Sequence, residues 1–225
     1  MSFAFFDLDD TLVDTGAALR AWSLDFVARH GLGSGPGGEQ AAAALAVQRR
    51  ENNVETWQQF AEQARTWYRI GTPAEELFEE IAATYVTKFS LSEEVAASLD
   101  RLRAAGWQLG SITNGLTAMQ HAKVDRIGLR EHVDLVLASE EAGYRKPDVR
   151  IFQLAAGKLG VELGAAGWMV GDRLDKDVEG GIAAGLHTVW LPRGRRRGWR
   201  SPRPEHCAAT IGEAFTILEA SGATE

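Results

Sequence analysis

The chain has 225 residues, of which 45% are hydrophobic and 24% are charged, so its composition is that of a folded globular protein and excludes wholesale disorder. Its 24 basic and 31 acidic residues give a net charge of −7, which argues against a general nucleic-acid-binding surface. We therefore expect no nucleic-acid partner.

Cysteine usage and hydropathy predict a cytoplasmic protein. Cys207 is the only cysteine, so no intrachain disulfide can form and a reducing compartment is expected. The apolar start at residues 1–6 is interrupted by Asp7 and lacks a basic leader, which does not fit a signal peptide. No apolar run approaches the roughly 20 residues of a membrane helix, so we expect no membrane partner. The oligomeric state stays open.

The N-terminal part of the chain predicts one strand followed by a helical insertion. Residues 3–8, FAFFDL, form an apolar run that ends in acids, as does a buried strand that opens onto a polar site. Residues 15–92 have helical spacing, with breaks at residues 31–38 and 71–73. We predict a helical cap over 15–92 and a catalytic core formed by 1–14 and 93–225.

The rest of the chain alternates between predicted helices and strands. The predicted strands are 107–113, 133–139, 167–172 and 187–191. The predicted helices are 91–106, 116–129, 148–160 and 176–185, and the glycines expected to end them are Gly106, Gly128, Gly160 and Gly185. This alternation predicts an α/β protein with a Rossmann-like, doubly wound parallel sheet and an inserted α-helical subdomain.

Polar residues follow three of the predicted strands. They are DLDDT at residues 7–11, TNG at 113–115 and GD at 171–172. The carboxyl ends of parallel strands meet at one rim, where ligands bind in this class of sheet. Between the last two strands of this set, Lys146 precedes Pro147, which disfavours a helix at the lysine.

Asp7 and Asp9 lie two residues apart, so in extended backbone their carboxylates face the same side. Asp7 and Asp172 supply the hard oxygen ligands that Mg²⁺ prefers. Lys146 and the hydroxyl of Thr113 are suited to stabilising phosphoryl oxygens by charge and hydrogen bonding.

These motifs resemble those of the haloacid dehalogenase superfamily, in its branch with a helical cap inserted after the first motif. The resemblance covers essentially the whole chain. The matching stretches are DLDDT at 7–11, SITNG at 111–115, Lys146 in YRKP, and GDRLDKD at 171–177.

The resemblance implies a role for each of these residues. Asp7 is the expected nucleophile that becomes an aspartyl-phosphate, and Asp9 the expected acid and base. The implied ligands of Mg²⁺ are Asp7, the carbonyl of Asp9, and Asp172, with Asp177 supporting the metal. The residues implied in phosphate binding are Thr113, Asn114, Gly115 and Lys146, with Thr113 and Lys146 also counted as catalytic.

Simpler structural roles are open for each residue taken alone. Asp9, Asp10 and Thr11, or Thr113 and Asn114, fit turns or helix caps, and so do Asp172 and Asp177. Lys146 alone fits a solvated loop. The basic segment 193–200 fits a solvated loop better than an anion-binding site, and Trp22, Trp57 and Trp67 fit helical packing better than substrate stacking.

The sequence favours a magnesium-dependent phosphatase that acts on a small phosphorylated metabolite. The stretch from residue 113 to 152 resembles nucleoside 5′-monophosphate and neuraminate 9-phosphate phosphatases, and phosphoglycolate is another candidate substrate. Three other functions stay open: a 2-haloacid dehalogenase, a phosphomutase of the β-phosphoglucomutase kind, and an inactive phosphate-binding protein. Asp9 and Asp172 argue against the dehalogenase, which needs neither a second aspartate nor a metal.

Overall fold

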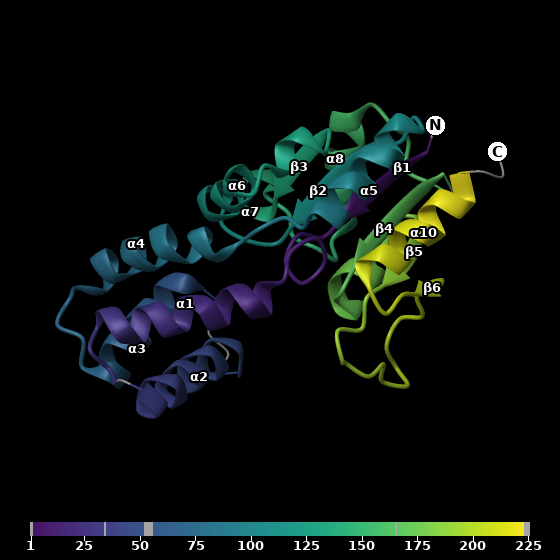
Figure 1. Cartoon of the computed structure of the whole chain (residues 1–225). Coiled ribbons are helices and arrows are strands. Elements are labelled where there is room, and N and C mark those ends of the chain that lie inside the picture. Colours follow the sequence, from purple (N-terminus) through teal and green to yellow (C-terminus); the bar gives the residue numbers. More distant parts are fainter. Residues whose placement is uncertain (1, 34, 52–55, 165, 223–225) are drawn as a thin grey trace. The chain divides into compact units, whose positions relative to one another are not determined.

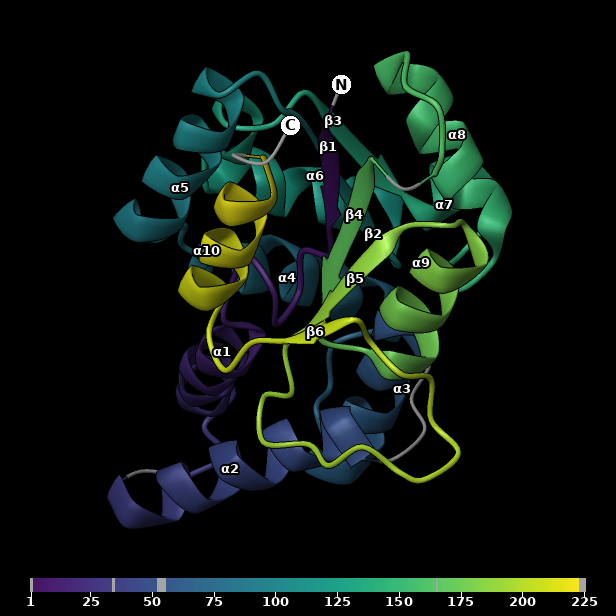
Figure 2. The same ribbon diagram turned by 90° about the vertical axis from the view of Figure 1, so that its right-hand side faces the viewer.

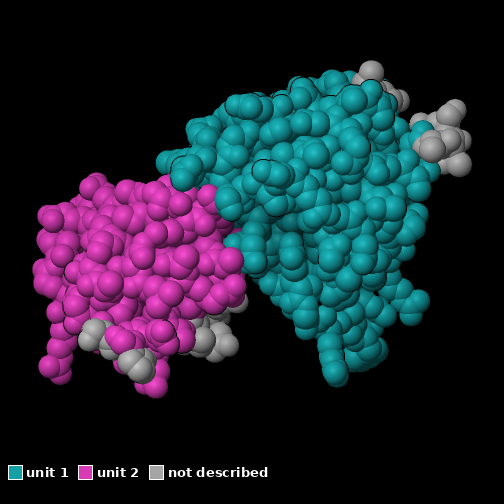
Figure 3. All heavy atoms as spheres, in the orientation of Figure 1, with its two compact units in different colours: residues 1–14, 90–225 teal, residues 15–89 magenta. Residues whose placement is uncertain are grey.

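The chain forms two compact units in a computed structural model that describes residues 2–33, 35–51, 56–164 and 166–222. The larger unit comprises Met1–Asp14 and Ser90–Glu225, and the smaller comprises Thr15–Phe89 (Figure 3). The sequence suggested residue 92 as the second boundary. In the structure, Ser92 belongs to the larger unit, where its hydroxyl accepts the N–H of Val95 at 3.2 Å and caps the next helix.

The larger unit is built on a parallel sheet (Figure 1). Its strands within the described ranges are β1 (Phe3–Phe6), β2 (Gln108–Thr113), β3 (Leu135–Ala138), β4 (Gly167–Gly171), β5 (His187–Trp190) and β6 (His206–Cys207). They lie in the order β3-β2-β1-β4-β5-β6, and all neighbours are parallel. The strand order therefore reverses beside β1, which confirms the predicted doubly wound sheet.

Helices cover both faces of this sheet. They are α5 (Glu93–Ala104), α6 (Thr117–Arg126), α7 (Ser139–Ala142), α8 (Val149–Leu159), α9 (Glu179–Ala183) and α10 (Ile211–Gly222), with short turns at η2 (Leu129–Glu131) and η3 (Leu174–Val178). Figure 2 shows α5 and α10 on one face, and α8 and α9 on the other. None of the described helices is both long enough and apolar enough to cross a bilayer.

Strand β1 lies at the centre of the core because both of its faces are apolar. Phe5 packs against Phe152 of α8 with ring centroids 6.4 Å apart, and Phe6 packs against Phe215 of α10 at 5.5 Å. All four rings are less than 2% exposed. Side chains alternate along a strand, so the run FAFF fills both sides and leads directly to Asp7 at the edge of the sheet.

Most predicted elements are present, and the elements that were not predicted include α7, β6 and the twelve-residue helix α10. The four expected helix-ending glycines all have positive φ: 86° at Gly106, 70° at Gly128, 71° at Gly160 and 74° at Gly185. The predicted helix 176–185 is in fact a π-helical turn at Leu174–Val178 followed by α9. Strand β6 has two residues and α7 has four, so neither shows a periodic pattern.

The described part of the smaller unit is helical and packs around Trp22. Its helices are α1 (Thr15–Arg29), α2 (Gly35–Glu51), α3 (Trp57–Tyr68), α4 (Ala74–Tyr85) and the turn η1 (Val86–Lys88). The Trp22 ring is fully buried, with ring centroids 4.9 Å from Phe26 and 6.0 Å from both Phe60 and Tyr85. Trp67, by contrast, is 38% exposed, so core packing describes Trp22 and not every tryptophan of this unit.

We predict that Trp22→Ala destabilises the smaller unit by about 3–5 kcal/mol, because it removes a fully buried ring and leaves a cavity. Urea unfolding followed by circular dichroism measures the loss. The matched control is Trp67→Ala on the partly exposed ring, which should cost less than half as much. Equal losses for the two variants would contradict a core centred on Trp22.

Candidate active site

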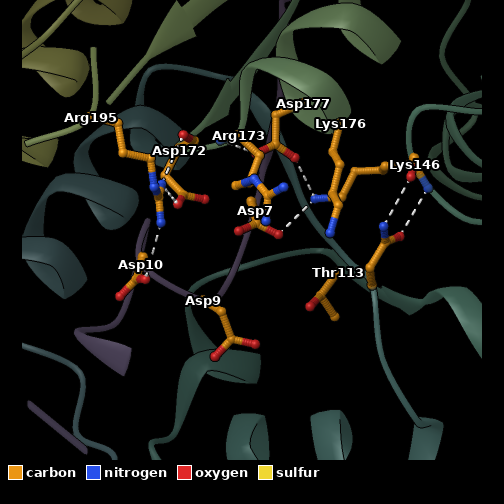
Figure 4. Close-up of a pocket in the computed structure, with 11 residues that line it drawn as sticks. Asp7, Asp9, Asp10, Thr113, Lys146, Asp172, Arg173, Lys176, Asp177 and Arg195 are labelled. Atoms are coloured by element: carbon orange, nitrogen blue, oxygen red, sulfur yellow. Dashed lines mark hydrogen bonds and ion pairs between the residues drawn. The ribbon is translucent and has the colours of Figure 1, made fainter. Parts of the chain in front are cut away.

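A polar pocket of about 160 Å³ opens at the carboxyl edge of the sheet. Its lining comes from the ends of β1, β2 and β4 and from the loops after β3 and β5 (Figure 4). The lining residues are Asp7, Asp9, Asp10, Thr113, Asn114, Lys146, Asp172, Arg173, Lys176, Asp177 and Arg195. The fold thus brings together every predicted site residue except Gly115.

Lys146 is the centre of the site. Its Nζ donates to Asp7 Oδ1 at 2.6 Å and to the carbonyl of Ile112 at 2.6 Å, and it lies 2.8 Å from Asp177 Oδ1. Its side chain is 1% exposed, so it is no solvated loop residue. Burial by itself lowers the pKa of Lys146, but Asp177 and Asp7 outweigh it and raise that pKa above its ordinary value. The buried amine is therefore charged.

The side chain of Asn114 holds the main chain of Lys146. Asn114 Oδ1 accepts the N–H of Lys146 at 2.9 Å, and Asn114 Nδ2 donates to its carbonyl at 3.0 Å. These two bonds fix the loop that carries the lysine. In this structure Asn114 therefore positions Lys146 and also lines the pocket, as does Thr113, the buried last residue of β2.

Gly115, predicted from the sequence to bind phosphate, lies beside the pocket. Its N–H donates to the hydroxyl of Ser139 at 3.1 Å, and it is not among the pocket-lining residues. A Cβ at this position would lie 2.5 Å from Nε2 of Gln120, a distance at which side-chain atoms clash. The glycine therefore leaves room for the Gln120 side chain beside the site.

Three buried carboxylates surround one small space. One oxygen each from Asp7, Asp172 and Asp177 lie within 4.8 Å of one another. Burial, reinforced by Asp177 and Asp172, raises the pKa of Asp7 from 3.8 to about 8, although Lys146 lowers it. Burial also raises the pKa of Asp172, against the lowering effect of Arg195. The charge of Lys146 therefore does not compensate all three carboxylates. Their oxygens form a donor set that fits Mg²⁺.

Asp177 also contributes to the local backbone. Its Oδ2 accepts the N–H of Arg173 at 2.9 Å, where the π-helical turn η3 begins. Its other oxygen, Oδ1, lies 2.8 Å from Nζ of Lys146, so one side chain both holds this turn and belongs to the acidic cluster.

Asp9 lies apart from this cluster, as Figure 4 shows. Nζ of Lys123 contacts both of its oxygens, at 2.8 and 2.9 Å, and Nε2 of Gln120 donates to Oδ2 at 3.1 Å. Sequence reasoning missed both partners. The available signal was their spacing, because residues 120 and 123 share one face of the predicted helix after the second motif.

Two arginines of the basic segment bind the loops of the site. Nε of Arg193 donates to the Asp10 carbonyl at 2.8 Å, and Arg195 is bonded to the Asp172 carboxylate and to its carbonyl, the latter at 3.2 Å. Arg193 and Arg195 are nevertheless exposed, and so is Trp199 at 85%, so these contacts occur within an exposed loop.

The site thus combines a Rossmann-like parallel sheet, a buried aspartate after the first strand and a buried lysine in contact with that aspartate. The family model of haloacid dehalogenase-like hydrolases matches residues 1–185, and the chain belongs to this family. The resemblance stated from the motifs is thereby confirmed.

Curated relatives of the chain carry phosphatase names. It is 41% identical to a glyceraldehyde 3-phosphate phosphatase of Methanopyrus kandleri, over 51% of this chain and 50% of that protein. It is 37% identical to a pyrimidine 5′-nucleotidase of Escherichia coli, over 49% of each. The chain thus spans about half the length of these two relatives. The human N-acylneuraminate-9-phosphatase is 28% identical over 96% of this chain and 92% of its own.

Solved structures share the fold over nearly the whole chain. A phosphatase of this family from Thermococcus onnurineus aligns with a TM-score of 0.67 and 25% identity, covering 97% of this chain and 98% of its own. An L-2-haloacid dehalogenase from Xanthobacter autotrophicus aligns with a TM-score of 0.70 over 97% and 98%, at 17% identity. The second likeness shows the fold alone.

We predict that Asp7→Asn stabilises the metal-free protein, and increasingly so as the pH rises. The folded-state pKa of Asp7 lies above its ordinary value of 3.8, so the stability that its protonated form contributes is present below pH 3.8 and is lost as the pH rises through about 8. In EDTA, the Tm of the variant should exceed that of the wild type by about 5 °C or more at pH 8, and by less at pH 5.

Asp125→Asn is the control for this titration, because Asp125 is an exposed aspartate of α6. It should show no growing difference in Tm over the same range. A difference for Asp7→Asn that is constant or shrinks with pH would contradict a raised pKa of Asp7. Added Mg²⁺ should raise the Tm of the wild type more at pH 8 than at pH 5, because more of Asp7 is ionised there.

Proposed function

We propose that the protein is a magnesium-dependent phosphomonoester hydrolase that acts on a small phosphorylated metabolite through an aspartyl-phosphate intermediate. The observation that carries this proposal is Asp7, a buried carboxylate in contact with Lys146, with Asp9 two residues further along in the same pocket. The phosphatase names of the curated relatives support it.

In the proposed first step, an oxygen of Asp7 attacks phosphorus while the bond from phosphorus to the leaving oxygen breaks. Asp9 gives a proton to that oxygen, so the product leaves as an alcohol. Asp9 then accepts a proton from the water that hydrolyses the aspartyl-phosphate. Asp9 thus serves both steps. The hydrolysis releases inorganic phosphate and regenerates free Asp7.

The other side chains of the pocket have supporting roles in this proposal. The charge of Lys146 and the hydroxyl of Thr113 are suited to hold the phosphoryl oxygens. Asp7, Asp172 and the carbonyl of Asp9 would hold Mg²⁺, supported by Asp177, and the bound ion would offset the negative charge of the phosphate. We assign the helical unit 15–89 to a cap that excludes water during turnover.

The substrate class is the narrower part of the proposal. The likeness to a pyrimidine 5′-nucleotidase and to an N-acylneuraminate-9-phosphatase makes nucleoside 5′-monophosphates and sugar phosphates the first candidates. Glyceraldehyde 3-phosphate joins them through another relative. Release of inorganic phosphate from a panel of these compounds, with phosphoglycolate included, ranks the candidates by kcat/KM.

Dehalogenase chemistry is the main competitor, since it uses the same nucleophile on the same fold. Asp9 in the pocket and the buried Asp172 favour phosphate, because attack on carbon needs neither a proton donor for an alkoxide nor a metal ligand. The discriminating assay measures hydrolysis of p-nitrophenyl phosphate with Mg²⁺ or with EDTA, and chloride release from 2-chloropropionate. Chloride release without phosphate release would overturn the proposal.

We predict that Asp7→Asn lowers the hydrolysis of p-nitrophenyl phosphate by about 10³-fold or more, because the amide is a poor nucleophile toward phosphorus. The far-ultraviolet circular dichroism should be unchanged. The control is Asp125→Asn, which should keep wild-type rates. Wild-type turnover by a folded Asp7→Asn protein would show that another group attacks phosphorus.

We predict that Asp9→Asn lowers kcat by about 10²–10⁴-fold, the usual contribution of a positioned acid and base. Rapid acid quenching should also trap more phosphorylated protein relative to turnover, since hydrolysis of the intermediate loses its base. The measurement is steady-state kinetics together with the mass of the quenched protein. A normal kcat would remove Asp9 from the proposed mechanism.

A further inference from the structure

Asp9 is fixed by a dedicated pair of residues on α6. Lys123 contacts both carboxylate oxygens, which fixes the plane of the group, and Gln120 adds a third bond to Oδ2. A carboxylate held by several donors from one side has little freedom to rotate. The arrangement therefore sets the direction in which Asp9 presents its oxygens to the pocket.

Lys123 is a buried lysine, so its charge needs a partner inside the protein. The side chain of Lys123 is 4% exposed, whereas that of Asp9 is 28% exposed. Taking an ammonium group out of water is strongly unfavourable unless a partner compensates its charge. Other lysines of the chain, such as Lys88, pair with acids at the surface, where a pair contributes little.

The loop before α6 is shaped to admit the second partner. Gln120 is 5% exposed, and the missing side chain of Gly115 provides the space that its amide occupies. Gln120 Nε2 also lies 3.4 Å from the carbonyl of Asn114, the residue that fixes Lys146. Gln120, which holds Asp9, thus contacts Asn114, which holds Lys146.

We propose that Lys123 and Gln120 are positioning residues for Asp9, and that they hold its carboxylate in the orientation from which it transfers the proton to the leaving oxygen. This inference rests on the proposed phosphatase function. Neither residue lines the pocket, so both act through Asp9 rather than on the substrate. Their loss should therefore weaken proton transfer while leaving attack by Asp7 in place.

The test compares phenyl phosphate with p-nitrophenyl phosphate. Phenol has a pKa of about 10, as tyrosine does, so its departure needs protonation much more than that of the far more acidic p-nitrophenol. Lys123→Met should lower kcat/KM for phenyl phosphate about tenfold more than for p-nitrophenyl phosphate. A merely structural defect would lower both rates alike and leave their ratio unchanged.

Three further variants make the result specific. Lys123→Arg should restore much of the ratio, because a guanidinium also contacts both oxygens of a carboxylate. Gln120→Leu should shift the ratio in the same direction by less, and it covers the case in which Lys123→Met fails to fold. Arg126→Met removes a charge from an exposed position of the same helix and should leave the ratio at its wild-type value.

The double variant Asp9→Asn/Lys123→Met separates the positioning role from any effect elsewhere. With Asp9 already disabled, Lys123→Met should change the ratio no further. If the wild type hydrolyses neither ester, the proposed function itself fails. If the wild type is active but Lys123→Met and Gln120→Leu leave the ratio unchanged, or raise the rate for phenyl phosphate, the positioning role alone is overturned.

Discussion

The site depends on the buried ammonium group of Lys146. It contacts Asp7 after β1, the carbonyl of Ile112 in β2, and Asp177 after β4. These three segments come from neighbouring strands, because β1 lies between β2 and β4 in the sheet. A buried charge costs several kcal/mol unless it is compensated, so the lysine and its acids have to be placed together. The strand order is what permits this.

The two aspartates of the first motif have different surroundings although they are two residues apart. Burial, reinforced by Asp177 and Asp172, raises the pKa of Asp7 to about 8. Asp9 is partly exposed and held by Lys123 and Gln120. In the proposed function, these surroundings belong to the nucleophile, Asp7, and to the acid and base, Asp9. The local environment, more than the motif, distinguishes them.

Several residues support the site by holding other residues in place. Asn114 fixes the main chain of Lys146, and Gly115 leaves space for Gln120. Arg193 binds the carbonyl of Asp10, a residue whose backbone is left-handed with a φ of 58°. Preorganised sites commonly need such support, since a small displacement of a reacting group lowers the rate sharply.

The sequence by itself determined the parallel sheet, the helix ends at its glycines and the gathering of acids at one rim. These features follow from local periodicity and from the rule that parallel strands end on one side. Only the tertiary structure decided which supporting side chain contacts which residue of the site. Lys123 and Asp9 are 114 positions apart, and Arg193 and Asp10 are 183 apart. Such contacts leave no periodic trace in the chain, because they depend on the packing of elements that are distant in sequence.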